Sequence, residues 1–209
     1  MSSDNSLERV EKLSETLEVL SSEYDLYILF IDLCDSASFK KYCLNNSMPP
    51  FIWISRQMVF LSRTANIVSR YEGTVVKTIG DEVMATFPTD INVETIFKCC
   101  REVFQLFDNL KAFNKAPFKI EAKASLDFGT CFDGRIIDTN YIDPIGTAVD
   151  RCARMSKHSS SNSIVFSHDL NQICLEQGFL FESGTVTEIE DDLKGLGKTK
   201  IYKINQVFS

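Results

Sequence analysis

Two carboxylates in this 209-residue sequence stand where a metal ion could be bound. Asp32 follows the apolar run 26–31, and Asp81 follows Gly80 within the segment 71–87, YEGTVVKTIGDEVMATF. A run this apolar is typical of a central strand buried on both faces, so we expect Asp32 at its C-terminal end. The Gly-Asp dipeptide between two apolar segments favours a tight hairpin turn, which places Asp81 at its tip.

If these strands are neighbours, both carboxylates project at one edge of the sheet. Oxygen ligands of this kind suit Mg²⁺ or Mn²⁺, which usually also keep water and substrate phosphates as ligands. The alternative is local: turns favour Asp for conformational reasons, and Asp35 or Ser36 can cap the following helix. Capping explains Asp35 well and Asp32 poorly.

Basic residues that could bind a triphosphate lie farther along the chain. Arg154 falls in the last turns of a predicted helix, and Lys194 falls in the glycine-containing loop 193–197. Each residue alone is a weak signal, because exposed Arg and Lys side chains mostly serve solubility.

The remaining pattern predicts the elements that position these residues. Helices are expected over residues 5–22, 36–42, 52–71, 93–113, 147–155 and 168–176, and strands over 26–31, the hairpin 71–87, 119–131, 164–166, 179–187 and 201–204. This order predicts an α+β fold in which helices cover one face of a mostly antiparallel sheet. We assign an N-terminal amphipathic helix to residues 1–24 and one catalytic domain to residues 25–209.

Composition excludes several classes of protein. A net charge of -7 argues against a nucleic-acid-coating protein or a polybasic membrane-binding protein. Seven cysteines without a C-x-x-C pair fit reduced thiols in the cytoplasm better than a disulfide scaffold or a zinc site. No apolar run is long enough for a membrane span.

Four segments together resemble one family. They are LFIDLCDSASF (29–39), the hairpin 71–87, DPIGTAVDRCARM (143–155) and LKGLG (193–197). In this order they resemble the catalytic domain of class III nucleotidyl cyclases, the adenylate and guanylate cyclase homology domain. The resemblance covers about residues 25–206 and implies a ferredoxin-like, palm-like sheet.

The resemblance implies a metal site and a dimer. Asp32 and Asp81 match the two metal-binding aspartates of the family, and the backbone carbonyl of Leu33 matches a further ligand. Two Mn²⁺ or Mg²⁺ ions per active site would follow. Because family active sites lie between two subunits and this chain holds both sets of residues, a homodimer is expected.

The resemblance also implies substrate contacts. Lys77 and Asp143 match the pair that reads the base, and Lys194 matches the lysine that holds the terminal phosphates. Arg154 matches the arginine that stabilises charge on the α-phosphate. Asp150 departs from the family, which usually has a ribose-orienting Asn at this catalytic position.

The implied reaction converts a nucleoside triphosphate to a 3′,5′-cyclic nucleotide and pyrophosphate. A lysine donor beside a carboxylate acceptor complements adenine or cytosine, and complements uracil if the two contacts exchange roles. The free-standing chain resembles the pyrimidine cyclases of bacterial Pycsar antiphage systems, which implies cUMP or cCMP as product and a downstream cyclic-nucleotide-binding effector.

Three alternatives stay open. They are an adenylate cyclase that makes cAMP, a degenerate homologue that binds nucleotide without turnover, and a diguanylate cyclase on a related fold. The turn Gly80-Asp81-Glu82 favours the last, whereas Ile79 and the context around Lys77 oppose it.

Overall fold

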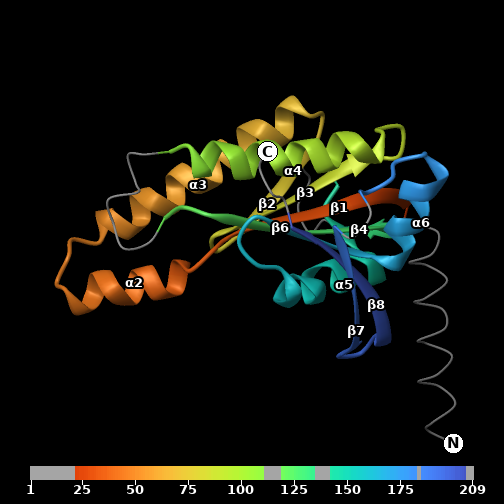
Figure 1. Cartoon of the computed structure of the whole chain (residues 1–209). Helices are drawn as coiled ribbons and strands as arrows, with labels where there is room; N and C mark the ends of the chain where they lie inside the picture. Colours follow the sequence, from red (N-terminus) through yellow and green to blue (C-terminus); the bar gives the residue numbers. More distant parts are fainter. Residues whose placement is uncertain (1–21, 111–118, 135–141, 183–184, 206–209) are drawn as a thin grey trace, which may run out of the picture.

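One sheet of eight strands runs through the computed structural model, which describes residues 22–110, 119–134, 142–182 and 185–205 (Figure 1). Seven strands lie side by side in the order β2-β3-β1-β4-β6-β8-β7, and β5 pairs with β4. The strands are β1 (Glu23–Leu33), β2 (Thr74–Ile79), β3 (Glu82–Pro88), β4 (Ala122–Asp133), β5 (Pro144–Ile145), β6 (Ser163–Ser167), β7 (Val186–Leu193) and β8 (Gly197–Asn205). Only the pairing of β4 with β6 is parallel among these described strands, which confirms the predicted α+β fold.

Strand β1 is the centre of the molecule and is buried on both faces, as its apolar run predicts. Because successive side chains alternate between faces, β1 contributes to two separate apolar clusters. These are Tyr27, Leu29, Ile31 and Leu33 on one face, and Leu26, Ile28 and Phe30 on the other.

The helices cover both faces of the sheet, although the larger layer lies on one of them (Figure 1). Helices α3 (Phe51–Arg70), α4 (Val93–Asp108) and α6 (His168–Glu176) pack on the face of Tyr27, and α2 (Ser36–Asn45) packs beside α3. Helix α5 (Thr147–Met155) lies on the opposite face and is followed by the short 3-10 helix Ser156–His158. The prediction that all helices share one face is therefore wrong for α5.

One further sequence prediction needs adjustment, and another is not tested. The strand predicted over 179–187 is displaced, because Phe179 and Phe181 pack against Phe97 as an irregular segment and β7 starts only at Val186. The predicted N-terminal helix lies outside the described residues, and β1 already begins at Glu23. Within the described ranges, the structure contains no helix that is long and apolar enough to cross a membrane.

Candidate active site

The hairpin of β2 and β3 carries Asp81 at its tip. Ile79 pairs with Glu82, so the turn consists of Gly80 and Asp81 alone. Gly80 has φ +65°, a left-handed conformation that glycine adopts without strain. On the neighbouring strand, Asp32 pairs with Glu82. The structure thus brings Asp32 and Asp81 to the same edge of the sheet, which is formed by the C-terminal end of β1 and the turn before β3.

Asp32 lies in a row of charged side chains across three strands. Its cross-strand neighbours are Glu82 on β3 and Lys123 on β4, and Lys123 Nζ lies 3.1 Å from Asp32 Oδ2. Burial raises the pKa of Asp32, and the hydrogen bond from Lys123 opposes this shift. Burial also raises the pKa of Glu82 to about 7, and the negative charges of Asp32 and Asp81 add to it. These mutually repelling carboxylates favour a bound cation.

The donors at this edge fit Mg²⁺ or Mn²⁺. The carboxylates of Asp32 and Asp81 and the carbonyl of Leu33 at the end of β1 supply oxygen, the ligand atom that these ions prefer. In the part of the chain that the structure describes, no three carboxylate, imidazole or thiol groups form a complete metal cage. A cation that keeps water and substrate phosphates as ligands needs no such cage.

Two side chains of helix α3 form hydrogen bonds with the backbone next to Asp32 and Asp81. The side chain of Arg56 is 2% exposed, and its Nη2 donates to the carbonyl of Lys119 at 2.6 Å and to that of Cys34 at 3.4 Å. The next residue, Gln57, donates from Nε2 to the carbonyl of Gly80 at 2.7 Å. One helix therefore fixes both the loop after Asp32 and the hairpin tip.

A second group of candidate residues lies on α5 and the turn between β7 and β8. Arg154 Nη1 donates to the carbonyl of Lys194, and Arg154 Nη2 lies 3.8 Å from Asp150 Oδ2 on the exposed side of the helix. The turn is closed by pairing of Leu193 with Gly197. The guanidinium of Arg154 thus contacts the backbone of the turn that carries Lys194.

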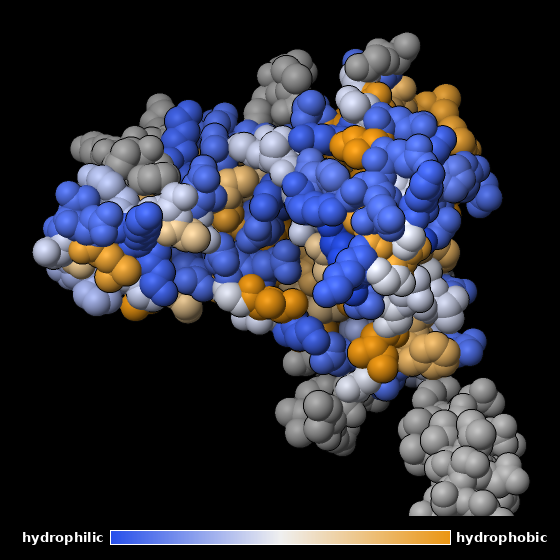
Figure 2. Space-filling view, turned by 90° about the horizontal axis from the view of Figure 1, so that it is seen from below, coloured by the Kyte–Doolittle hydropathy of each residue, from blue (hydrophilic) through white to orange (hydrophobic). Residues whose placement is uncertain are grey.

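The third group is the ion pair of Lys77 and Asp143. Lys77 Nζ lies 2.7 Å from Asp143 Oδ1 and 3.0 Å from Oδ2, and both side chains are partly exposed. Lys77 belongs to the edge strand β2, and Asp143 directly precedes β5. The face of the molecule that carries α5 is mainly hydrophilic, with separate apolar patches (Figure 2).

The structure thus arranges the predicted residues in three groups, each with its own contacts. Sequence reasoning gave no role to Lys123 or Arg56, and it considered Glu82 only as part of the hairpin turn; the structure places all three around the edge that carries Asp32. Lys123 and Glu82 face Asp32 only because of the strand register, and the amino-acid pattern of a single strand carries no information on register.

Comparisons with known proteins show the family and the fold of this chain. The sequence model of the adenylate and guanylate cyclase catalytic domain matches residues 19–206. Among solved structures, the guanylate cyclase domain of RhGC from Catenaria anguillulae in complex with GTP is 16% identical with a TM-score of 0.69, covering 90% of this chain and 100% of that one. The catalytic core of a rhodopsin-guanylyl cyclase with converted specificity, in complex with ATPalphaS, is 17% identical with a TM-score of 0.70, covering 90% and 98%. These likenesses show a shared fold.

A curated relative is the uridylate cyclase of Rhodovulum sp. (strain MB263). It is 29% identical over 155 residues, which are 68% of this chain and 61% of the relative. This chain therefore spans about three fifths of that relative's length.

Fold and sequence together define a nucleotide cyclase catalytic domain. The chain belongs to the adenylate and guanylate cyclase catalytic domain family.

Proposed function

We propose that this chain is a homodimeric cyclase that converts a pyrimidine nucleoside triphosphate, UTP first, to its 3′,5′-cyclic nucleotide and pyrophosphate. The observation that carries the proposal is the placement of Asp32 and Asp81 at one end of β1 and β3, whereas Arg154 lies on α5 and contacts the turn that carries Lys194. Two copies arranged head to tail would bring the carboxylate edge of one to the basic pair Arg154 and Lys194 of the other. The uridylate cyclase relative supports UTP as the substrate.

Asp32, Asp81 and the Leu33 carbonyl would hold Mg²⁺ or Mn²⁺. When bound, such ions supply positive charge that favours deprotonation of the ribose 3′-hydroxyl and neutralises the leaving pyrophosphate. In this arrangement Glu82 and Lys123 set the charge around the Asp32 carboxylate.

The basic pair acts on the phosphates. The 3′-oxygen attacks the α-phosphorus and forms a new O–P bond, while the bond between the α-phosphorus and the oxygen that leaves with pyrophosphate breaks. Negative charge grows on the phosphoryl oxygens during this step. Arg154 donates to those oxygens, where a preorganised donor is most effective. The Lys194 ammonium neutralises the terminal phosphates. Asp150 stands where the family usually has Asn, so a neutral amide that can donate is replaced by a carboxylate that only accepts. The Asp150 carboxylate would therefore accept a hydrogen bond from a ribose hydroxyl group and stay away from the negatively charged phosphates.

The ion pair of Lys77 and Asp143 faces the base. Uracil presents O4 as an acceptor and N3–H as a donor, so Lys77 donates to O4 and Asp143 accepts from N3–H. Adenine also fits the pair, because Lys77 can donate to N1 while Asp143 accepts from the 6-amino group, which makes an adenylate cyclase the second candidate. The two side chains are 2.7 Å apart, so they can bind neighbouring atoms of one base edge, since the ammonium has further N–H donors and the carboxylate further lone pairs.

The cellular setting is part of the proposal. All seven cysteines are free thiols, which fits the reducing cytoplasm. A cyclic pyrimidine nucleotide made there would act as a second messenger of antiphage defence through a separate effector that binds it.

The test is to incubate the purified protein with ATP, GTP, CTP or UTP and Mn²⁺, and to separate the products by chromatography. We expect cyclic UMP as the main product, no product from Asp32→Ala, and unchanged turnover for Asp90→Asn, which removes an exposed carboxylate elsewhere. Cyclic AMP alone would identify the second candidate. Thermal stabilisation by nucleotide without any cyclic product would identify a degenerate homologue and overturn the proposal.

A further inference from the structure

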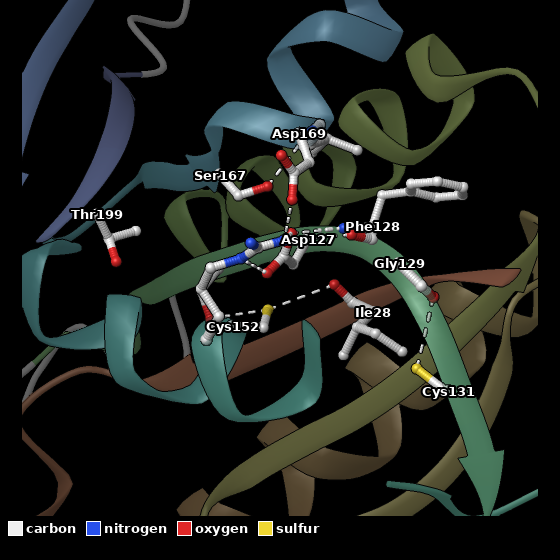
Figure 3. A network of polar contacts seen from close by, with 12 residues as sticks. Ile28, Asp127, Phe128, Gly129, Cys131, Cys152, Ser167, Asp169 and Thr199 are labelled. Atoms are coloured by element: carbon white, nitrogen blue, oxygen red, sulfur yellow. Dashed lines mark hydrogen bonds and ion pairs between the residues drawn. The ribbon is translucent and has the colours of Figure 1, made fainter. Parts of the chain in front are cut away.

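Arg151 forms a bridge that ties α5 to two other elements. Its Nε lies 2.7 Å from Asp127 Oδ2 and its Nη2 lies 3.0 Å from Asp127 Oδ1, on strand β4. The same Nη2 lies 2.5 Å from Asp169 Oδ2, in the first turn of α6. Figure 3 shows Asp127 and Asp169 turned toward each other from these two elements.

The inner half of this bridge is deeply buried. The Asp127 side chain is fully inaccessible, whereas that of Asp169 is 53% exposed. Burial raises the pKa of Asp127 despite the opposing effect of Arg151, and pairing with both carboxylates raises the pKa of Arg151. An isolated carboxylate at position 127 would be unfavourable, so the sheet holds Arg151 firmly.

Apart from this bridge, α5 packs on the sheet through Ala148 and Cys152, and at its C-terminal end through buried Met155, which clusters with residues of β6, β7 and β8. Ala148 lies so close to Gly129 that a Cβ at residue 129 would be 2.9 Å from its own Cβ. Cys152 Sγ donates to the carbonyl of Ile28 at 3.4 Å (Figure 3). These contacts hold α5 against the sheet, and none of them involves a residue of α6.

Part of the side of α5 that faces α6 and β8 borders an open hollow. This hollow has a volume of about 480 Å³, and its lining includes Thr147 and Arg151 of α5, His168 of α6, and Lys198 and Thr199 of β8. The ion pair of Arg151 with Asp169 connects α5 to α6 across this hollow.

We infer that Arg151 is a positioning residue that sets where α5 presents Asp150 and Arg154 to the substrate. Asp150 precedes it and Arg154 follows it by less than one turn, so a shift or rotation of the helix moves all three side chains together. The inference rests on the proposed cyclase function for its catalytic consequence. Its structural content, the immobilisation of α5 by Asp169, stands independently.

The test uses Asp169→Asn in the full chain, because this change removes the outer carboxylate and leaves buried Asp127 paired. We expect kcat to fall about tenfold with KM within about twofold, since small misplacement of a catalytic group lowers the rate strongly. Hydrogen exchange of the amides of residues 147–155 should rise, and that of β1 and β3 should not. Asp169→Glu, which keeps the charge, should restore most of both properties.

Glu176→Gln is the matched control, since it removes one exposed carboxylate from the other end of α6. It should leave kcat and exchange unchanged. The inference is overturned if Asp169→Asn leaves the exchange of α5 unchanged, or if its kcat equals that of the control. If the wild-type protein has no cyclase activity, the proposed function fails, and the exchange measurement still decides the role of Arg151.

Discussion

Lys123 Nζ lies 3.1 Å from Asp32 Oδ2, across the neighbouring strands β4 and β1. The proposed metal-binding carboxylate therefore already has a cationic partner within its own chain. A divalent ion that binds Asp32 must either share this carboxylate with the ammonium or displace it. We therefore expect Lys123 to affect metal affinity, although β4, the strand that carries it, contributes no proposed metal ligand.

Replacing Lys123 with Met should tighten Mn²⁺ binding. A unit charge a few ångströms from a dication opposes binding by about 1 kcal/mol or more even in a strongly screened setting, so we expect a dissociation constant lower by roughly threefold to tenfold. Calorimetric titration of nucleotide-free protein measures this. Lys41→Met, a change at an exposed lysine of α2, is the control and should have no effect. Weaker binding in Lys123→Met would contradict competition.

The stability of the metal-free protein should depend on Glu82 between about pH 4.5 and about pH 7. The pKa of Glu82 rises from its ordinary 4.5 to about 7, so in this window the folded chain holds a proton that the unfolded chain releases. The contribution of the Glu82 carboxyl group to the free energy of unfolding is fully present below about pH 4.5, and it is lost as the pH rises to about 7. After allowance for solvent screening, wild type should lose about 1–2 kcal/mol relative to Glu82→Gln.

Urea unfolding in the presence of a chelator at several pH values checks this dependence. Parallel stability profiles for wild type and Glu82→Gln would show that the carboxyl group titrates normally in the folded protein.

Two inactive variants should restore activity when they are mixed. In the proposed head-to-tail dimer, Asp32→Ala damages one half of each active site and Arg154→Ala damages the other half. Random exchange makes half of the dimers mixed, and each mixed dimer has one intact site of two, so activity should return to roughly a quarter of wild type. Assay before and after co-refolding measures it, and mixing two preparations of Asp32→Ala is the control. Activity that stays at the level of the single variants would exclude shared sites.

Gly73→Ala should loosen the hairpin that carries Asp81. A Cβ at residue 73 would lie 2.5 Å from Phe87 Cζ and 2.7 Å from Val68 Cγ1, where β2 leaves α3. Overpacking of this kind lowers the free energy of unfolding by about 1–3 kcal/mol. Gly80→Ala, with φ +65° and open space around its Cβ position, tests backbone strain alone and should be milder. Equal losses in chemical unfolding would show that the contact with Phe87 relaxes freely.

The sequence predicts local features of the site well and distant ones poorly. Gly80 and Asp81 form the expected turn because the backbone preferences of these two residues alone favour a two-residue hairpin turn. The bridge of Arg151 to Asp127 and Asp169 depends on how α5 and α6 meet β4, which is information that no single segment contains.

Two wrong expectations have the same origin. The apolar stripe of α5 is equally compatible with either face of a sheet whose central strand is apolar on both. Phe179 and Phe181 alternate as strand residues do, yet they fill the aromatic cluster around Phe97 instead of pairing with a neighbour. Tertiary packing overrides the local pattern in both places.

The central position of β1 also shapes how the chain must fold. This strand pairs with β4, which follows it by roughly a hundred residues, and with β3, roughly fifty residues later. During synthesis the central strand, with its apolar run 26–31, therefore emerges long before either neighbour exists. Contacts of such long range slow folding, and an exposed apolar strand with two open edges invites aggregation in the meantime. We expect slow refolding from denaturant and a dependence on chaperones for yield in the cell.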